Sequence, residues 1–230
     1  MNGSDPGGTE TCVGLPGPRI SPPIVLIGIV GFTPVLDSYP LGPKLMSALE
    51  ARLADHSGVI IENMTWSPIH VVQRFQDEGA IRPGRLVLVG AAATCNCPGT
   101  VRAVRWIGGR LPDAVMQDRI YEAVTGVVDI ENTLVIGAYF EVWPDDVYTV
   151  EIDLPADTFG RMVIADSEGW ASDEALAYHL GFSPAVATAA LAEAAAVLAI
   201  DGAAAQIPVE PKGARDLAQI EPFARTHVAR

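Results

Sequence analysis

The sequence predicts an α/β fold in which a mostly parallel central sheet lies between two layers of helices. Pro23–Val30 is an almost unbroken apolar run, which is typical of a strand buried on both faces of a parallel sheet. A repeated strand, helix, strand pattern follows it, and such crossovers are right-handed in nearly all known proteins. The chain has 230 residues, of which 49% are hydrophobic, enough for one sizeable core. We therefore expect a three-layer sandwich.

The first half of the chain carries the clearest periodicity. Leu41–Asp55 has a leucine at every fourth position and charged residues between them, which predicts an amphipathic helix. Val59–Glu62 is the second expected strand. Pro68 begins a helical segment that runs to about Glu78, and the break at Pro83 and Gly84 precedes a third strand at Arg85–Val89.

The second half is less regular. Apolar and polar residues alternate over Val101–Ile107, which has glycines close to both of its ends. This pattern predicts an added edge or hairpin strand. Asp113–Val128 is an expected helix with Asp113 as its cap, and Thr133–Glu141 an expected central strand. Residues 143–171 lose helical periodicity and are interpreted as an extended insertion that leaves the sheet. Ser183 should cap a final alanine-rich helix that ends at Gly202. The face of this helix expected to pack on the sheet comprises Val186, Ala190, Leu191, Ala194, Val197 and Leu198.

The two ends of the chain are expected to lie outside the domain. Residues 1–22 are rich in Gly, Pro, Ser and Thr without the basic and apolar regions of a secretory signal, so we expect a disordered leader. The domain then spans residues 23–202, and residues 203–230 form a loosely held tail. Three cysteines do not make a disulfide framework, which favours a cytoplasmic protein.

The charge balance narrows the function classes. A net charge of −13 argues against binding to nucleic acids or anionic membrane surfaces. Apolar runs such as 24–30 and 86–93 are too short to cross a bilayer, so no membrane span is expected. Gly28–Gly31 lacks the third glycine and the adjacent helix of a dinucleotide fingerprint, so no nucleotide cofactor is expected.

Ligands of open α/β sheets bind beyond the carboxyl ends of the strands. The loops that begin at Gly31, Glu62, Gly90 and Glu141 are therefore the places to look for a site. Paired carboxylates at strand ends can bind a metal or carry out acid/base chemistry, although solvated loop carboxylates are commoner. Cys95 and Cys97 follow the third strand, without the further ligands that a zinc site needs. The candidate cleft comprises Phe32, Asp37, Glu62, Trp66, His70 and Cys95.

The order of these segments resembles the endopeptidases that mature nickel-iron hydrogenases by trimming the C-terminus of the large subunit. The resemblance covers about Ile24–Gly202. Its best stretch is Leu176–Val186, which is similar to the family's apolar-Gly-Leu-Ser/Thr-Pro-x-Val pattern before the last helix. The glycine loop that ends in Asp37, followed by Gly42 and an apolar helix, also resembles the family. The resemblance implies a phosphorylase/hydrolase-like sandwich.

The chain departs from the family at the metal ligands. The family has two adjacent acids in the first loop, whereas this chain has Asp37 followed by Ser38. The family's third strand ends in a metal-binding Asp, where this chain has Gly90, and no histidine occurs between His70 and His179 to supply the third ligand. Asp37 is thus the one residue that could stand in for a family ligand.

The resemblance and the missing metal ligands together suggest three possible functions. The first expectation is a non-catalytic relative that binds a hydrogenase or other metalloenzyme subunit, or an assembly factor, as a chaperone or scaffold. Such a protein needs no cofactor of its own and would meet nickel only through its partner. The second is an active peptidase with rearranged ligands drawn from Asp37, Glu62, His70 or Cys95. The third is another hydrolase or a small-ligand binder, because a fold does not fix a function.

Overall fold

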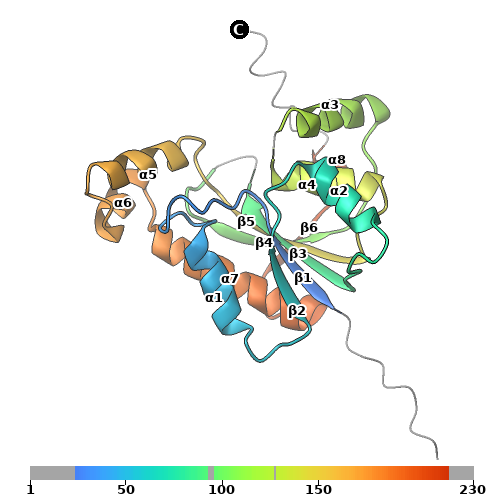
Figure 1. Ribbon diagram of the computed structural model, residues 1–230, viewed down its shortest axis with the longest axis horizontal. Helices are drawn as coiled ribbons and strands as arrows, with labels where there is room; N and C mark the ends of the chain where they lie inside the picture. The colour runs from blue at the N-terminus through green and yellow to red at the C-terminus, as the bar shows by residue number, and fades with distance from the viewer. Residues whose placement is uncertain (1–23, 93–95, 127, 218–230) are drawn as a thin grey trace, which may run out of the picture.

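The centre of the molecule is one six-stranded sheet with helices on both faces (Figure 1). The computed structural model describes residues 24–92, 96–126 and 128–217. The strands are β1 (Val25–Ile29), β2 (Val59–Asn63), β3 (Arg85–Ala91), β4 (Val101–Trp106), β5 (Asp146–Ile152) and β6 (Val209–Lys212). Their order across the sheet is β2-β1-β3-β5-β4-β6. β2, β1, β3 and β5 run parallel, whereas β4 is antiparallel to β5 and parallel to β6. The predicted three-layer α/β sandwich is confirmed.

The helices divide into two covering layers and a separate pair. One layer contains α1 (Pro43–Arg52) and α7 (Pro184–Asp201), whose leucines and alanines pack on one face of the sheet. The other contains α2 (Pro68–Gln76), α3 (Asp113–Val124), α4 (Ile130–Tyr139) and the short α8 (Ala214–Leu217). α5 (Thr158–Ser167) and α6 (Asp173–Leu180) project beyond the sheet (Figure 1). A short 3-10 helix, η1 (Gly202–Ala204), follows α7.

The first half of the chain folds as its periodicity predicts. The strands β1, β2 and β3 and the helices α1 and α2 lie within a few residues of their expected bounds. All four leucines of the amphipathic helix segment are buried. Ser183 caps α7 through a hydrogen bond of 3.2 Å from the Val186 amide to its hydroxyl, as expected.

The predicted central strand at Thr133–Glu141 is wrong, because Ile130–Tyr139 is the helix α4. Asp129 caps this helix by accepting the Asn132 amide at 2.6 Å. Its residues from Ile130 to Gly137 are all buried, so the sequence shows no polar face. An all-round apolar segment of this length has no periodicity that separates a buried helix from a buried strand.

Residues 143–171 do not form one extended insertion outside the sheet. Asp146–Ile152 is β5, which pairs with β3 on one side and with β4 on the other. The chain leaves the sheet only after this strand, and there it forms the helices α5 and α6. Val101–Trp106 is a strand as expected, although β6 pairs with its outer side and it is not the sheet edge.

The expected tail is partly structured, because residues 209–217 form β6 and α8 and bury Ala214 and Leu217 against the α2–α4 layer. The expected leader, residues 1–22, lies outside the described residues, as do residues 218–230.

The packing face of α7 also differs from the prediction. Val186 is 69% exposed, and the buried face is centred on residues such as Ala187, Leu191, Ala195 and Leu198. Alanine occurs on every side of this helix, so apolar character does not mark one face. α7 with η1, Pro184–Ala204, is also long and apolar enough to cross a membrane, but half of that window is buried within the molecule, as in a core helix.

Candidate functional site

The carboxyl ends of the four parallel strands meet at one edge of the sheet, which is where ligands of such folds bind. β1, β2 and β3 supply three of the expected strand-end loops. The fourth was expected at Glu141, which is wrong, because Glu141 follows the helix α4. The fourth strand end is instead Ile152, with Asp153 directly after it.

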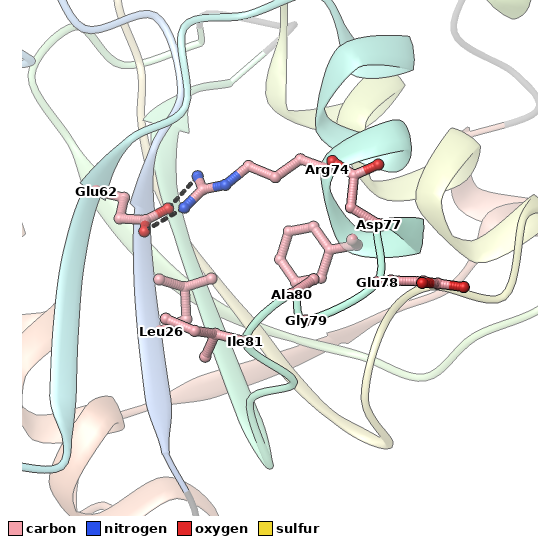
Figure 2. A pocket seen from close by; sticks show the side chains of 9 residues that line it. Leu26, Glu62, Arg74, Asp77, Glu78, Gly79, Ala80 and Ile81 are labelled. Atoms are coloured by element: carbon pink, nitrogen blue, oxygen red, sulfur yellow. Dashed lines mark hydrogen bonds and ion pairs between the residues drawn. The ribbon is translucent and has the colours of Figure 1, made fainter.

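Glu62 and Arg74 form the strongest polar contact among the predicted site residues. Glu62 lies near the end of β2, and both of its carboxylate oxygens accept hydrogen bonds from the Arg74 guanidinium group on α2 (Figure 2). These hydrogen bonds raise the pKa of Arg74 above its usual range. The Trp66 ring lies 5.1 Å from the same guanidinium group, a cation–π distance.

A cavity of about 310 Å³ lies beside this ion pair, between the strands β1 and β2 and the C-terminal end of α2 (Figure 2). Leu26, Phe75 and Ile81 contribute apolar walls. The polar lining comprises the ion pair and the acidic residues Asp77 and Glu78. His70 lies one turn before Arg74 on α2 and is exposed. Because the Glu62 carboxylate is already held by Arg74, it is not free to act as a base or as a metal ligand.

Phe32 and Asp37 lie in the long loop between β1 and α1. Phe32 is half-buried against the α1–α7 side of the core, and its carbonyl accepts the Thr65 hydroxyl at 3.1 Å. Asp37 is exposed, and its neighbour Leu36 is buried against α5 and α6. The predicted cleft residues therefore separate into two groups, with Glu62 and Trp66 beside α2 and Asp37 on the side of the α5–α6 pair.

Gly90 is closely packed at the end of β3. A Cβ atom at this position would lie 3.3 Å from both the Ile130 Cβ and the Val30 carbonyl oxygen. That distance is tighter than ordinary van der Waals contact, so the position has little room for a carboxylate side chain. Ile130, the first residue of α4, thus covers the face of the sheet at Gly90.

Asp153 is the polar residue at the strand ends that the sequence analysis missed. It is 2% exposed and accepts hydrogen bonds from the Cys97 amide at 3.1 Å and from the Arg102 guanidinium group at 2.7 Å. The Asn96 amide also donates to it, at 3.2 Å. Asp153 therefore fastens the loop after β3 to the end of β5. Its strand was misplaced in the sequence analysis, so no signal marked it as a strand-end residue.

The α5–α6 pair packs against the β1–α1 loop, which follows the carboxyl end of β1. Met162, Ala165, Leu176 and Leu180 bury their side chains between the two helices and against Leu36 of the β1–α1 loop. A second set of apolar side chains on the same helices is exposed, although the Phe159 ring also packs edge-to-face on Tyr39 of the β1–α1 loop. These residues are Phe159, Val163, Ile164 and Tyr178, and we call them the outer apolar set.

The described residues contain no group of three His, Cys, Asp or Glu side chains close enough to hold one metal ion. Cys95, the last member of the predicted cleft, lies outside the described residues. Cys97 is an exposed free thiol. Comparison of the chain with protein-family models, with curated proteins and with solved structures found no match in any of the three.

Proposed function

We propose that this chain is a cytoplasmic accessory protein that binds a subunit of a metalloenzyme, such as a hydrogenase, without cleaving it. The proposal rests on the resemblance of its sequence to the hydrogenase maturation endopeptidases. It also rests on the close packing and ion pairing of the residues at the strand ends. It assigns no resident metal or cofactor to the chain. The chain would contact nickel only where the metal is already held by the bound subunit.

The positions that correspond to the family's metal ligands support a binding role. Gly90 stands where the family has a carboxylate, and the packing of Ile130 leaves little room there for a longer side chain. Glu62 is not at one of these positions but was a candidate for a rearranged ligand set, and its carboxylate is paired with Arg74. Asp37 remains as a single exposed carboxylate, and one carboxylate alone does not make a tight nickel site.

The observation that carries the proposal is the outer apolar set on α5 and α6. Tyr178 is 84% exposed and Ile164 is 53% exposed, although a helix pair of this size could place polar residues at both positions. We take these exposed apolar side chains on one pair of helices as the surface that a partner protein covers. Exposed acidic residues, Asp166, Glu168 and Glu174, occur on the same unit. We therefore expect the partner segment to be apolar and flanked by lysine or arginine.

Affinity purification from the native host tests this function. We would compare the tagged wild-type protein with the Ile164→Glu and Tyr178→Glu variants and identify metalloenzyme subunits by mass spectrometry. The wild-type protein should enrich one such subunit, and both variants should lose it. Val124→Glu is the matched control, because Val124 is an exposed apolar residue of α3, in the helix layer on the other side of the molecule.

An Asp37→Ala variant separates binding from peptidase chemistry. A scaffold should still enrich the same subunit, at its mature or immature length, when this carboxylate is removed. Loss of C-terminal trimming of the subunit in cells that carry Asp37→Ala, with binding retained, would instead identify the chain as an active peptidase and overturn the proposal.

A further inference from the structure

A cavity of about 680 Å³ lies at the opposite end of the sheet from the strand ends discussed above. It is lined by the end of β4, the C-terminal end of α4 and the segment 141–145, which connects α4 to β5. Because β4 is antiparallel to β5, the end of β4 lies beside the start of β5. The volume is in the range of small-molecule sites.

Glu141 lines this cavity in a backbone conformation that glycine normally supplies. Nine glycines among the described residues have a positive φ, and Glu141, at +56°, is the one residue of another type. Its amide donates to the Ala138 carbonyl at 3.2 Å, and the Val142 amide donates to the Gly137 carbonyl at 3.0 Å, which is the pattern of a Schellman helix stop. A glycine would form the same stop without the steric cost. The chain thus places a carboxylate on the cavity wall at a position where the backbone favours glycine.

Unpaired charges of both signs line the same cavity. Asp145 adds a second carboxylate, and Arg105 of β4 adds a guanidinium group. Neither of them, nor Glu141, takes part in an ion pair within the described part of the chain. All three residues are exposed, so their charges are accessible to a ligand.

Two tryptophans give the cavity aromatic walls. The Trp143 ring packs edge-to-face on Phe75, and its indole N–H donates to the Leu134 carbonyl at 2.9 Å. Trp106 is only 7% exposed, and its indole N–H has no hydrogen-bond partner among the described residues. This N–H is not among the unpartnered atoms sealed from solvent. Because Trp106 lines the cavity, its N–H is a donor that a ligand there can use.

We propose that this cavity binds a zwitterionic amino acid with a large apolar side chain. The guanidinium group of Arg105 and the indole N–H of Trp106 donate to its carboxylate, and Glu141 and Asp145 accept from its ammonium group. Its apolar side chain lies along Trp143. A simple anion would meet two carboxylates of like charge, and a simple cation would meet the guanidinium group, so a zwitterion matches the lining best. The site does not depend on the partner-binding surface on α5 and α6.

NMR titration of the full-length protein with L-phenylalanine tests this site, since each of the four tryptophans gives its own indole N–H signal. The signals of Trp106 and Trp143 should shift with saturation. Those of Trp66 and Trp170, which do not line the cavity, should stay in place. Phenylpropanoate lacks the ammonium group and phenethylamine lacks the carboxylate. Each should bind about tenfold more weakly than L-phenylalanine, as expected for a lost hydrogen bond between charged groups.

Substitutions of Glu141 and Arg105 should each remove one half of the recognition. Glu141→Gln should weaken binding of L-phenylalanine about tenfold and should not weaken binding of phenylpropanoate. Arg105→Gln should weaken binding of L-phenylalanine by a similar factor and should not weaken binding of phenethylamine. Glu141→Gly should bind as weakly as Glu141→Gln, yet its melting temperature should be at least that of the wild-type protein, because glycine is favoured at this helix stop.

Glu50→Gln and Arg52→Gln are the matched controls, because both residues are exposed on α1, which packs on the other face of the sheet. Both variants should bind L-phenylalanine as tightly as the wild-type protein. Three results would each overturn the proposal. They are the absence of saturable shifts of the Trp106 and Trp143 signals, equally tight binding of either single-charge ligand, and wild-type affinity of Glu141→Gln for L-phenylalanine.

Discussion

Arg85 and Asp146, at the starts of the neighbouring strands β3 and β5, form an ion pair in which Nε and Oδ2 are 2.7 Å apart. The remaining side of the Arg85 guanidinium group faces the C-terminal end of α7. Its Nη1 atom donates to the Ala199 carbonyl at 2.9 Å and lies within 3.3 Å of the Leu198 and Ile200 carbonyls. A positive charge at this end of a helix is favourable, and the last carbonyls gain partners. The pair therefore joins the sheet to its longest covering helix.

Gly202 directly follows this contact, and we expect Gly202→Ala to be strongly destabilising. A Cβ atom at this position would lie 2.1 Å from an Arg85 guanidinium nitrogen, and the residue has a φ of +53°. Since Arg85 is held by Asp146 and by the helix carbonyls, it does not move aside freely. The free energy of unfolding should fall by about 3 kcal/mol, measured by urea denaturation.

Gly169→Ala is the matched control for backbone strain at Gly202. Gly169 has a φ of +74°, and a Cβ atom there would meet nothing within 4 Å. Its substitution should cost only about 1 kcal/mol for the left-handed conformation. Equal losses at the two glycines would show that Arg85 does not restrict position 202.

The buried face of α7 gives a second prediction. Leu191 is fully buried among the alanines that contact the sheet, so Leu191→Asp buries an unpaired charge and should cost more than about 4 kcal/mol or prevent folding. Val186 is exposed in the first turn of the helix, where a negative charge is favourable. Val186→Asp should therefore change stability by less than about 0.5 kcal/mol. Thermal unfolding of both variants checks the assignment, and a large loss for Val186→Asp would place the packing face elsewhere.

The sequence predicted the fold where residue types differ between buried and exposed positions. The leucines of α1 alternate with charged residues, so that helix and the strands around it were placed correctly. α4 and α7 are apolar on nearly every side. The sequence therefore predicted a strand in place of α4 and the wrong packing face for α7. β5 was not assigned to the sheet because its contacts with β3 and β4 are long-range and leave no local mark.

The candidate site was harder to predict for the same physical reason. Glu62 and Trp66 were identified from their place at a strand end, but their partner Arg74 lies on the next helix, and nothing local indicates that the two charges meet. Asp153 was missed together with its strand. The donors that a carboxylate finds in the folded chain decide whether it is free for chemistry, and those donors depend on packing.

Asp129 gives a prediction about pH. Burial raises the pKa of this carboxyl above its usual value, although the Asn132 amide partly offsets the effect. The folded state therefore binds the Asp129 proton more tightly than the unfolded state does. Its contribution to stability is greatest below the unfolded pKa near 3.8 and declines as the pH rises toward the folded pKa.

Asp129→Asn isolates this effect, because asparagine can still cap α4 and does not titrate. Relative to the wild-type protein, the variant should gain stability as the pH is raised from 4 toward 7, measured by urea denaturation across about that range. Asp129→Ala does not titrate at this position either, so it should be about 1 kcal/mol less stable than Asp129→Asn at every pH through loss of the cap. A constant difference between the wild-type protein and Asp129→Asn would mean that the carboxyl titrates alike in both states.

Nickel affinity tests whether the ion pair between Glu62 and Arg74 keeps the strand-end carboxylate from binding metal. Calorimetry of the wild-type protein should show no nickel site tighter than roughly micromolar, because Asp37 stands apart and Glu62 is already bonded. Arg74→Ala frees the Glu62 carboxylate and keeps His70, which lies one helical turn before position 74 on α2. The variant should therefore bind nickel several-fold more tightly than the weak binding of the wild-type protein. Arg110→Ala removes a comparable exposed arginine and should have no effect. A tight stoichiometric site in the wild-type protein that Asp37→Ala, Glu62→Ala or His70→Ala abolishes would contradict this account, since the ligands would then be assembled despite the ion pair.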